Sequence, residues 1–158
     1  MVNYGGILSP FNAWLVARGL VTAPLRMRQH SEVAMKVARW LESSPAVRFI
    51  WYPGLESHPQ HERAVRYMNG QYSGMISFDI NGDEAAHQKF LDSLTLVTHA
   101  VSLGDVESLI VYYDKSSDKL PHYPELYREG FFRFSIGLED AEDIISDLLQ
   151  AMENAGVL

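Results

Sequence analysis

Apolar residues at helical spacing dominate the first third of the chain. Ser9 followed by Pro10 is typical of a helix start, because serine caps the first turn and proline is tolerated at its first position. We predict a first helix from there to Gly19 and a second, longer helix that begins at Thr22. The second helix carries one apolar stripe at the spacing i, i+4, i+7 and i+8, formed by Val33, Val37, Trp40 and Leu41.

Beyond residue 46 the pattern changes to extended segments that are rich in β-branched and aromatic residues. Ile76, Phe78 and Ile80 alternate with polar residues, which predicts a strand with one buried face. The predicted strands are Val47–Tyr52, Ile76–Ile80, Leu94–Val101, Leu109–Tyr113 and Phe131–Ile136.

Three shorter helices are predicted between and after these strands. Ser57 and Gln60 have the spacing of a capping box, which indicates the start of a short helix. Another helix is predicted over Glu84–Leu91, and Asp140 caps the last one. The stretch Asp114–Tyr123, with its serines, lysines and proline, predicts a long exposed loop.

This order of elements predicts an α+β fold. We expect a small, mainly antiparallel sheet with helices on one face, preceded by a long helix. We divide the chain into a helical linker, residues 1–45, and an α+β domain, residues 46–158. The start of the long helix has little of its own to pack against, so we expect it to contact something outside this domain.

The bulk composition narrows the classes of function. The 158 residues can bury the core of one domain, and the net charge of −7 argues against nucleic-acid binding, which needs a basic face. The absence of cysteine excludes disulfides, thiolate nucleophiles and cysteine-based metal sites. No apolar run approaches the ~20 residues of a membrane span, and no signal pattern opens the chain. We expect a cytoplasmic protein that binds neither nucleic acid nor membrane.

Arg133 is the residue that most strongly suggests a binding site. In its predicted strand it alternates with Phe132 and Phe134, so it points away from the face that they bury. A guanidinium among apolar residues needs an anionic partner, and its planar fork suits a carboxylate. The residues alone leave two partners open: a ligand carboxylate, or one of the chain's 20 acidic side chains in a structural ion pair.

Two further candidates carry less information. Gly104, two residues after Ser102, allows either the close approach of a ligand or simply a turn. His58 and His61 lie three residues apart, but no third ligand is evident beside them. We therefore predict no metal site.

Five segments of the chain resemble one enzyme family, the Cys/Met-metabolism or trans-sulfuration enzymes that depend on pyridoxal 5′-phosphate (PLP). The similarity is to the C-terminal part of these enzymes, which include cystathionine γ-synthase, cystathionine lyases and methionine γ-lyase. It spans nearly the whole chain. The segments are SPFNAWLVARGLVTAPLRMRQH (9–30), YPGLESHPQHE (52–62), GMISFDI (74–80), SLGDVESL (102–109) and RFSIGLEDAEDIISDL (133–148).

The resemblance implies a C-terminal domain of a fold-type I PLP-dependent transferase, reached through residues 1–45 from an N-terminal domain that binds PLP. Such enzymes are usually homo-oligomers, and they carry out β- or γ-elimination or γ-replacement on sulfur amino acids. Arg133 matches the arginine that binds the α-carboxylate of the amino-acid substrate. Ser102 matches a serine that lies in the same pocket and contacts the substrate through its backbone. Neither residue is thereby assigned a catalytic role.

Two departures from the family pattern limit the implied activity. The lysine that forms the Schiff base with PLP precedes the similar region in the family, and Lys36, Lys89, Lys115 and Lys119 lack its sequence context. We therefore expect this chain alone to be inactive and not to bind PLP covalently. The segment Val111–Glu125 replaces a stretch that lines the family's site, so the sulfur amino acid stays open. The alternative is a truncated, non-catalytic binding or assembly module derived from the family.

Overall fold

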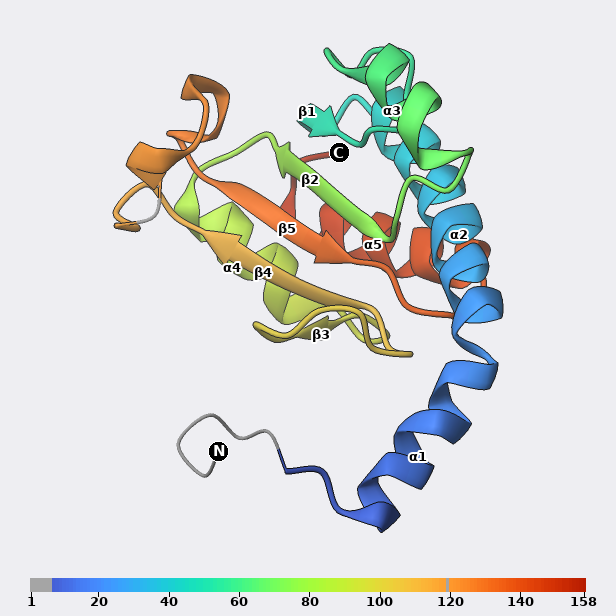
Figure 1. Cartoon of the computed structure of the whole chain (residues 1–158). Coiled ribbons are helices and arrows are strands. Elements are labelled where there is room, and N and C mark those ends of the chain that lie inside the picture. Colours follow the sequence, from blue (N-terminus) through green and yellow to red (C-terminus); the bar gives the residue numbers. More distant parts are fainter. Residues whose placement is uncertain (1–6, 119) are drawn as a thin grey trace.

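The computed structural model describes residues 7–118 and 120–158, which form one sheet with helices packed against it (Figure 1). Two short 3-10 turns precede the last strand. The helices are α1 (Pro10–Val21), α2 (Ala23–Ser43), α3 (His61–Met68), α4 (Glu84–Ser93) and α5 (Ala141–Ala155). The strands are β1 (Val47–Trp51), β2 (Met75–Ile80), β3 (Thr98–His99), β4 (Leu109–Tyr113) and β5 (Phe131–Ser135). The 3-10 turns are η2 (Leu120–His122) and η3 (Glu125–Tyr127).

The sheet has the strand order β1-β2-β5-β4-β3, and every neighbouring pair is antiparallel except the short β3–β4 pair. The last strand of the chain, β5, is therefore the central one. Its Arg133 lies opposite Ser77 of β2 and Val111 of β4. This topology confirms the predicted α+β class with a mainly antiparallel sheet.

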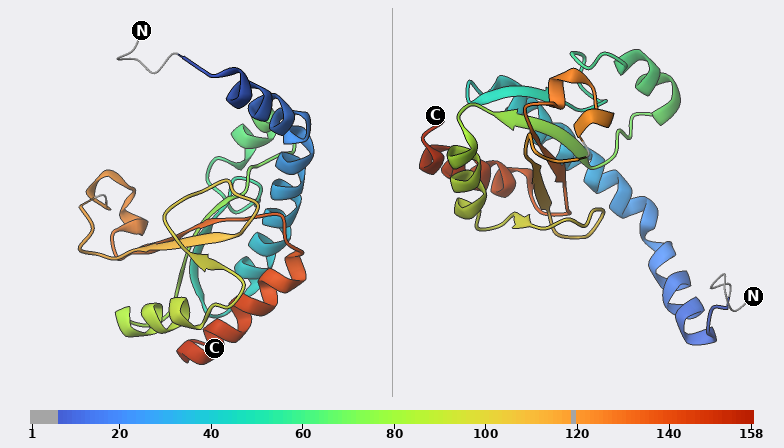
Figure 2. Two further views of the ribbon diagram at one scale, coloured as in Figure 1. Left: turned by 90° about the horizontal axis from the view of Figure 1, so that it is seen from below. Right: turned by 90° about the vertical axis from the view of Figure 1, so that its left-hand side faces the viewer.

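Helices α2, α4 and α5 cover one face of the sheet, as predicted (Figures 1 and 2). Phe78, Phe132 and Phe134 are fully buried on that face. Phe78 and Phe132 stack with their ring centroids 5.3 Å apart, and the ring of Phe90 from α4 meets Phe132 edge-on at 5.2 Å. Burial of aromatic side chains of this size is the main driving force for the fold.

The opposite face is covered only in part, by the segment that joins β4 to β5. Leu120 and Tyr127 of this segment are buried against Phe131, and Phe49 and Trp51 of β1 pack around them. The prediction of a wholly exposed loop over Asp114–Tyr123 was therefore wrong at Leu120. The connection folds back because an aromatic surface is available on the sheet beneath it.

Helix α1 contributes no buried residue and extends away from the sheet (Figures 1 and 2). Its predicted start is confirmed, since Ser9 Oγ accepts the N–H of Asn12 at 3.2 Å. The helix continues past Gly19 to Val21, however, and Thr22 makes no capping bond to α2. Within the described residues, no helix is both long enough and apolar enough to cross a membrane.

The last two thirds of α2 belong to the core, unlike its start. The predicted stripe residues Val33, Val37 and Leu41 are buried against the sheet and α5, whereas Leu25 is 62% exposed. His30 is also buried, and its Nδ1 lies 2.7 Å from the carbonyl oxygen of Ile136. This hydrogen bond fastens α2 to the chain where it leaves the central strand.

The predicted strand Leu94–Val101 was wrong over most of its length, because only Thr98 and His99 pair with β4. The reason is Asp147 of α5. Its carboxylate accepts the N–H groups of Thr95, Leu96 and Val97 at 2.9, 3.0 and 2.9 Å, so these groups cannot form a strand ladder.

The predicted capping box before α3 was also wrong. Ser57 donates its hydroxyl hydrogen to Glu42 of α2, and the helix begins only at His61, with no side-chain cap. The N–H of Gln60 donates instead to His58 Nδ1 at 3.1 Å. Glu42 thus bonds the hydroxyl of Ser57 and His58 bonds the N–H of Gln60, so neither group is available for the expected capping box. Asp140 likewise precedes α5 without a side-chain capping bond.

Asp147 offers a test of this fold. Burial raises the pKa of its carboxyl, but the hydrogen bonds from Val97, Thr95 and Leu96 outweigh that effect and hold the pKa below its usual value. We expect Asp147→Ala to lower the free energy of unfolding by about 2–4 kcal/mol at neutral pH, since three backbone donors lose their acceptor. Asp143→Ala, at an exposed position in the first turn of the same helix, should lower it by at most about 1 kcal/mol, the size of a helix-dipole contribution.

The pH dependence follows from the lowered pKa. The contribution of Asp147 is complete above the unfolded value of about 3.9 and is lost as the pH falls through the lower folded value. Urea unfolding followed by circular dichroism should therefore show the gap between wild type and Asp147→Ala narrowing below about pH 4. A gap that stays constant on acidification would contradict the assignment.

Candidate functional site

Arg133 lies in the middle of the central strand, on the face of the sheet that the helices do not cover. Its neighbours Phe132 and Phe134 are fully buried on the helical face, so alternation directs Arg133 to the other side, as predicted. The side chain is half-buried there, beside Ser77 and Val111 of the flanking strands.

Backbone carbonyl groups hold one end of the Arg133 guanidinium. Its Nη2 donates to the carbonyl oxygens of Val101 and Ser102, at 2.5 and 3.1 Å. The ring of Tyr113 lies 5.9 Å from the guanidinium carbon, near the limit for a cation–π contact. The guanidinium is thus oriented by neutral groups that leave its positive charge unneutralised.

The Nε–H of Arg133 is buried and has no acceptor among the described residues. No carboxylate of those residues lies within ion-pair distance of Arg133 either, because both ion pairs that they form involve Asp79. The alternative of a structural ion pair is therefore wrong for the described part of the chain. A buried donor of this kind costs about 1–3 kcal/mol unless an acceptor arrives from outside.

The loop over residues 101–108 brings the two carbonyl groups to Arg133. The side chain of Ser102 is exposed, and its contact with Arg133 is through its backbone oxygen. Gly104 has a φ of 74°, which favours glycine, and its N–H donates to Ser135 Oγ of the central strand at 2.9 Å. Gly104 therefore makes a turn that fastens the loop beside Arg133.

A second set of bonds joins this loop to the segment after the central strand. Glu139 accepts the N–H of Ser108 at 2.6 Å and its hydroxyl at 2.9 Å, and Ser108 Oγ in turn accepts the N–H of Gly137 at 2.9 Å. The N–H of Leu138 donates to the carbonyl oxygen of Val106 at 2.8 Å. We call this group, Val106, Ser108, Gly137, Leu138 and Glu139, the loop clasp.

The sequence singled out the two segments that meet here but not the clasp residues within them. Neither Glu139 nor Ser108 is a candidate site residue in the sequence analysis. The available signal was that both residues occur inside the SLGDVESL and RFSIGLED segments. The two candidate site residues, Arg133 and Ser102, are in direct contact.

Comparison with known proteins identifies the family. The sequence model of one family, the Cys/Met metabolism PLP-dependent enzymes, matches residues 1–153 of the chain. The chain belongs to this family. It is 45% identical over 156 residues to the canavanine γ-lyase of Pseudomonas canavaninivorans and 44% identical over 154 residues to the L-methionine γ-lyase of Treponema denticola. These matches cover 97% and 94% of the chain but only 39% and 38% of the two enzymes.

Solved structures of the family agree with the fold. Cystathionine γ-synthase of Xanthomonas oryzae pv. oryzae, in complex with aminoacrylate and cysteine, superposes with a TM-score of 0.78 at 38% identity. The match covers 95% of this chain and 40% of that one. The predicted fold class, an α+β domain of the fold-type I PLP-dependent enzymes, is thereby confirmed, and the chain spans about two fifths of its relatives' length.

The loop clasp depends on the absence of a side chain at Gly137. A Cβ atom there would lie 2.3 Å from Glu139 Oε2 and 2.4 Å from the carbonyl oxygen of Val106. We expect Gly137→Ala to destabilise the fold by about 1–3 kcal/mol and to open the loop, because backbone must move. In hydrogen exchange, the amides of Gly104 and Ser108 should lose protection together.

Gly19→Ala is the matched control, since no atom lies within 4 Å of a Cβ at that exposed helical position. It should leave both amides protected and stabilise the chain slightly, by up to about 1 kcal/mol. Equal effects of the two substitutions would contradict the clasp.

Proposed function

We propose that this chain supplies the substrate-carboxylate half of a PLP-dependent enzyme of amino-acid metabolism, with Arg133 as the residue that binds the α-carboxylate. The observation that carries the proposal is the Nε–H of Arg133, a buried donor without an acceptor on a guanidinium without a counter-ion among the described residues. A carboxylate supplies both missing elements at once.

The geometry favours a carboxylate over other anions. The Nε–H edge of the guanidinium also carries an N–H of Nη2, which donates to the carbonyl oxygens of Val101 and Ser102, so a carboxylate would accept from Nε–H and share Nη2 with these carbonyl groups. Because Nη2 is anchored to the carbonyl oxygens of Val101 and Ser102, the plane of the fork is fixed before a ligand arrives. Such preorganisation would orient the α-carbon of the substrate relative to the sheet.

The role that we propose for Ser102 is to position this fork. Its carbonyl oxygen accepts from Nη2, while the loop clasp and the Gly104–Ser135 bond hold the loop in place. In the segment 111–125, Val111 pairs with Arg133 across the sheet, and the ring of Tyr113 lies 5.9 Å from the guanidinium carbon of Arg133. We propose that this segment contributes to the choice of substrate side chain.

The names of the relatives support a common requirement rather than one substrate. They specify canavanine, methionine and cystathionine, which differ in their side chains but share an α-carboxylate. We therefore assign elimination or replacement at the β or γ carbon of an amino acid, with sulfur amino acids as the preferred class. In this chemistry PLP, when bound, stabilises the carbanion formed from the substrate.

None of the described lysines lies on the strands beside Arg133. Lys36 and Lys89 are exposed on α2 and α4, which pack on the face of the sheet opposite to Arg133, and Lys115 lies beyond the end of β4. Lys119 lies outside the described residues. We propose that the PLP-binding residues come from a further, N-terminal part of the protein and that this chain alone is inactive.

The surface of α1 and the start of α2 supports such a partner. Its large apolar side chains are each 47–78% exposed, although apolar patches of this extent are uncommon on proteins that act alone. We propose that the PLP-binding part covers them and that copies of the chain associate through them when it is absent. The exposed residues are Ile7, Leu8, Phe11, Trp14, Leu15, Val16, Leu20, Val21, Leu25 and Met27.

The role of Arg133 can be measured in a fusion that joins this chain to the PLP-binding part of the Treponema denticola L-methionine γ-lyase. We expect Arg133→Ala to lower kcat/KM by about a hundredfold or more, chiefly through KM, because the counter-charge of the substrate carboxylate and its charge-assisted hydrogen bonding are lost. Arg133→Lys should recover only part of this, since an ammonium cannot form the fork. Arg63→Ala, at an exposed position on α3, is the control. An unchanged KM for Arg133→Ala would refute the assignment.

The apolar surface gives an independent prediction for the chain alone. In sedimentation velocity, the 158-residue chain should associate as its concentration rises, and Phe11→Glu with Trp14→Glu should make it monomeric. Stability should be unchanged, because α1 buries nothing. Val65→Glu, at a 50% exposed position on α3, should leave association as it is. A wild-type chain that stays monomeric at all concentrations would contradict this role of α1.

A further inference from the structure

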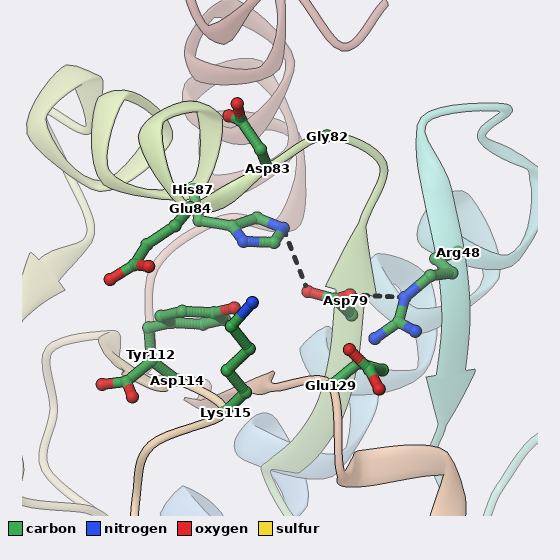
Figure 3. A pocket seen from close by; sticks show the side chains of 10 residues that line it. All are labelled: Arg48, Asp79, Gly82, Asp83, Glu84, His87, Tyr112, Asp114, Lys115 and Glu129. Atoms are coloured by element: carbon green, nitrogen blue, oxygen red, sulfur yellow. Dashed lines mark hydrogen bonds and ion pairs between the residues drawn. The ribbon is translucent and has the colours of Figure 1, made fainter.

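A second polar cluster, separate from Arg133, lies where β2 ends against the start of α4. Asp79 is its centre, and its side chain is only 2% exposed. Arg48 Nε donates to Asp79 Oδ2 at 2.6 Å, and His87 Nε2 lies 3.3 Å from Asp79 Oδ1. A pocket of about 260 Å³ opens beside these groups, and Figure 3 shows its lining residues.

Two buried acceptors in this cluster make no hydrogen bond within the described residues, although His87 Nε2 lies 3.3 Å from one of them. Asp79 Oδ1 has no hydrogen bond, and neither has His87 Nδ1. The neighbouring His87 Nε2 lies 3.1 Å from the carbonyl oxygen of Ile80, so Nε2 carries the hydrogen of the neutral ring and Nδ1 presents a lone pair. The side chain of His87 is 7% exposed. Both atoms can therefore bond an N–H or O–H donor from a ligand or an ordered water.

The charge around the pocket determines which donor is favoured. Five carboxylates line it, against the two permanent cations Arg48 and Lys115. Burial and the negative charges of Asp79 and Asp114 raise the pKa of Tyr112 on the pocket wall to about 12. The pocket thus has a negative potential and an aromatic ring in its wall, a combination that attracts an organic cation.

We propose that this pocket binds a small organic amine in its protonated form, whose ammonium group donates to Asp79 Oδ1. Any positive charge of the amine that Asp79 leaves unbalanced would be neutralised at the rim by Glu84, Asp114 and Glu129. The alkyl chain of the amine would contact the ring of Tyr112. An ammonium group has three N–H donors, so it can bond Asp79 Oδ1 and rim carboxylates together, which one hydroxyl cannot. The site is independent of the proposed carboxylate site.

Other ligand classes fit less well. No group of three metal-ligating side chains with suitable geometry occurs in the described chain, and the Arg48 guanidinium already occupies Asp79 Oδ2. An anion would gain from Arg48 and Lys115 but would face five carboxylates. Lys115 is exposed and lines the same pocket, so its ammonium competes with a ligand amine. This competition provides a sharp test.

The test uses 1,4-diaminobutane as the probe, titrated into the 158-residue chain at neutral pH and constant ionic strength and followed by amide NMR. We expect saturable shifts confined to residues 79–87 and 112–115. Glu84→Gln at the exposed rim should weaken binding several-fold and Asp79→Asn by about tenfold, through loss of a charge-assisted hydrogen bond. Lys115→Ala should tighten binding, while Glu153→Gln on α5 should leave it unchanged.

Two outcomes would contradict the proposed amine site. Shifts that do not saturate, or that 1,4-butanediol and sodium chloride reproduce, would overturn the proposal in favour of ordered water and simple screening. Weaker binding in Lys115→Ala together with saturable binding of succinate would identify an anion site instead. If Asp79→Asn fails to fold for want of the Arg48 partner, Glu84→Gln and Lys115→Ala decide the question, because both positions are exposed.

Discussion

The alternation of side chains along the central strand is the constraint on which the candidate site depends. Phe132 and Phe134 are buried against the helices, and each contributes roughly 2–3 kcal/mol of apolar burial, so the strand cannot turn over without losing its core. Arg133 is therefore held on the opposite face by residues that never contact a ligand. Its Nε–H is buried without an acceptor, which costs free energy, and the burial of the core offsets that cost.

The loop over residues 101–108 converts this placement into a binding geometry. Carbonyl oxygens satisfy the guanidinium in part without neutralising it, and the clasp through Ser108 and Glu139 keeps them in position. A carboxylate from the chain itself at the same place would have closed the site. Glu139, which follows the central strand, is instead bonded to Ser108.

Much of the fold could be predicted from the sequence, because its strongest signals are local. The apolar stripe of α2 and the alternation around Phe78 and Phe132 place the helical face of the sheet correctly. The failures occurred where one distant side chain outweighed a local pattern. Asp147 takes the backbone donors of residues 95–97, and Glu42 takes the hydroxyl of Ser57.

In the candidate site, too, local patterns were predictable from the sequence and long-range contacts were not. Strand periodicity placed Arg133 on the open face, but its partner could not be chosen until the loop of Ser102 was located beside it. The loop clasp and the Asp79–His87 cluster join residues at least 8 positions apart, so no spacing rule reveals them. Both consist of ordinary polar residues whose role appears only through their partners.

From family membership and the open guanidinium we propose that this chain is one half of a site whose other half binds PLP. The most direct test is to mix the chain with the separately produced PLP-binding part of the Treponema denticola L-methionine γ-lyase and to measure amino-acid turnover. We expect turnover from the mixture only, and its loss when the chain carries Arg133→Ala. Turnover by the chain with PLP alone, or a mixture indifferent to Arg133→Ala, would show that Arg133 is not the substrate-carboxylate residue of a divided site.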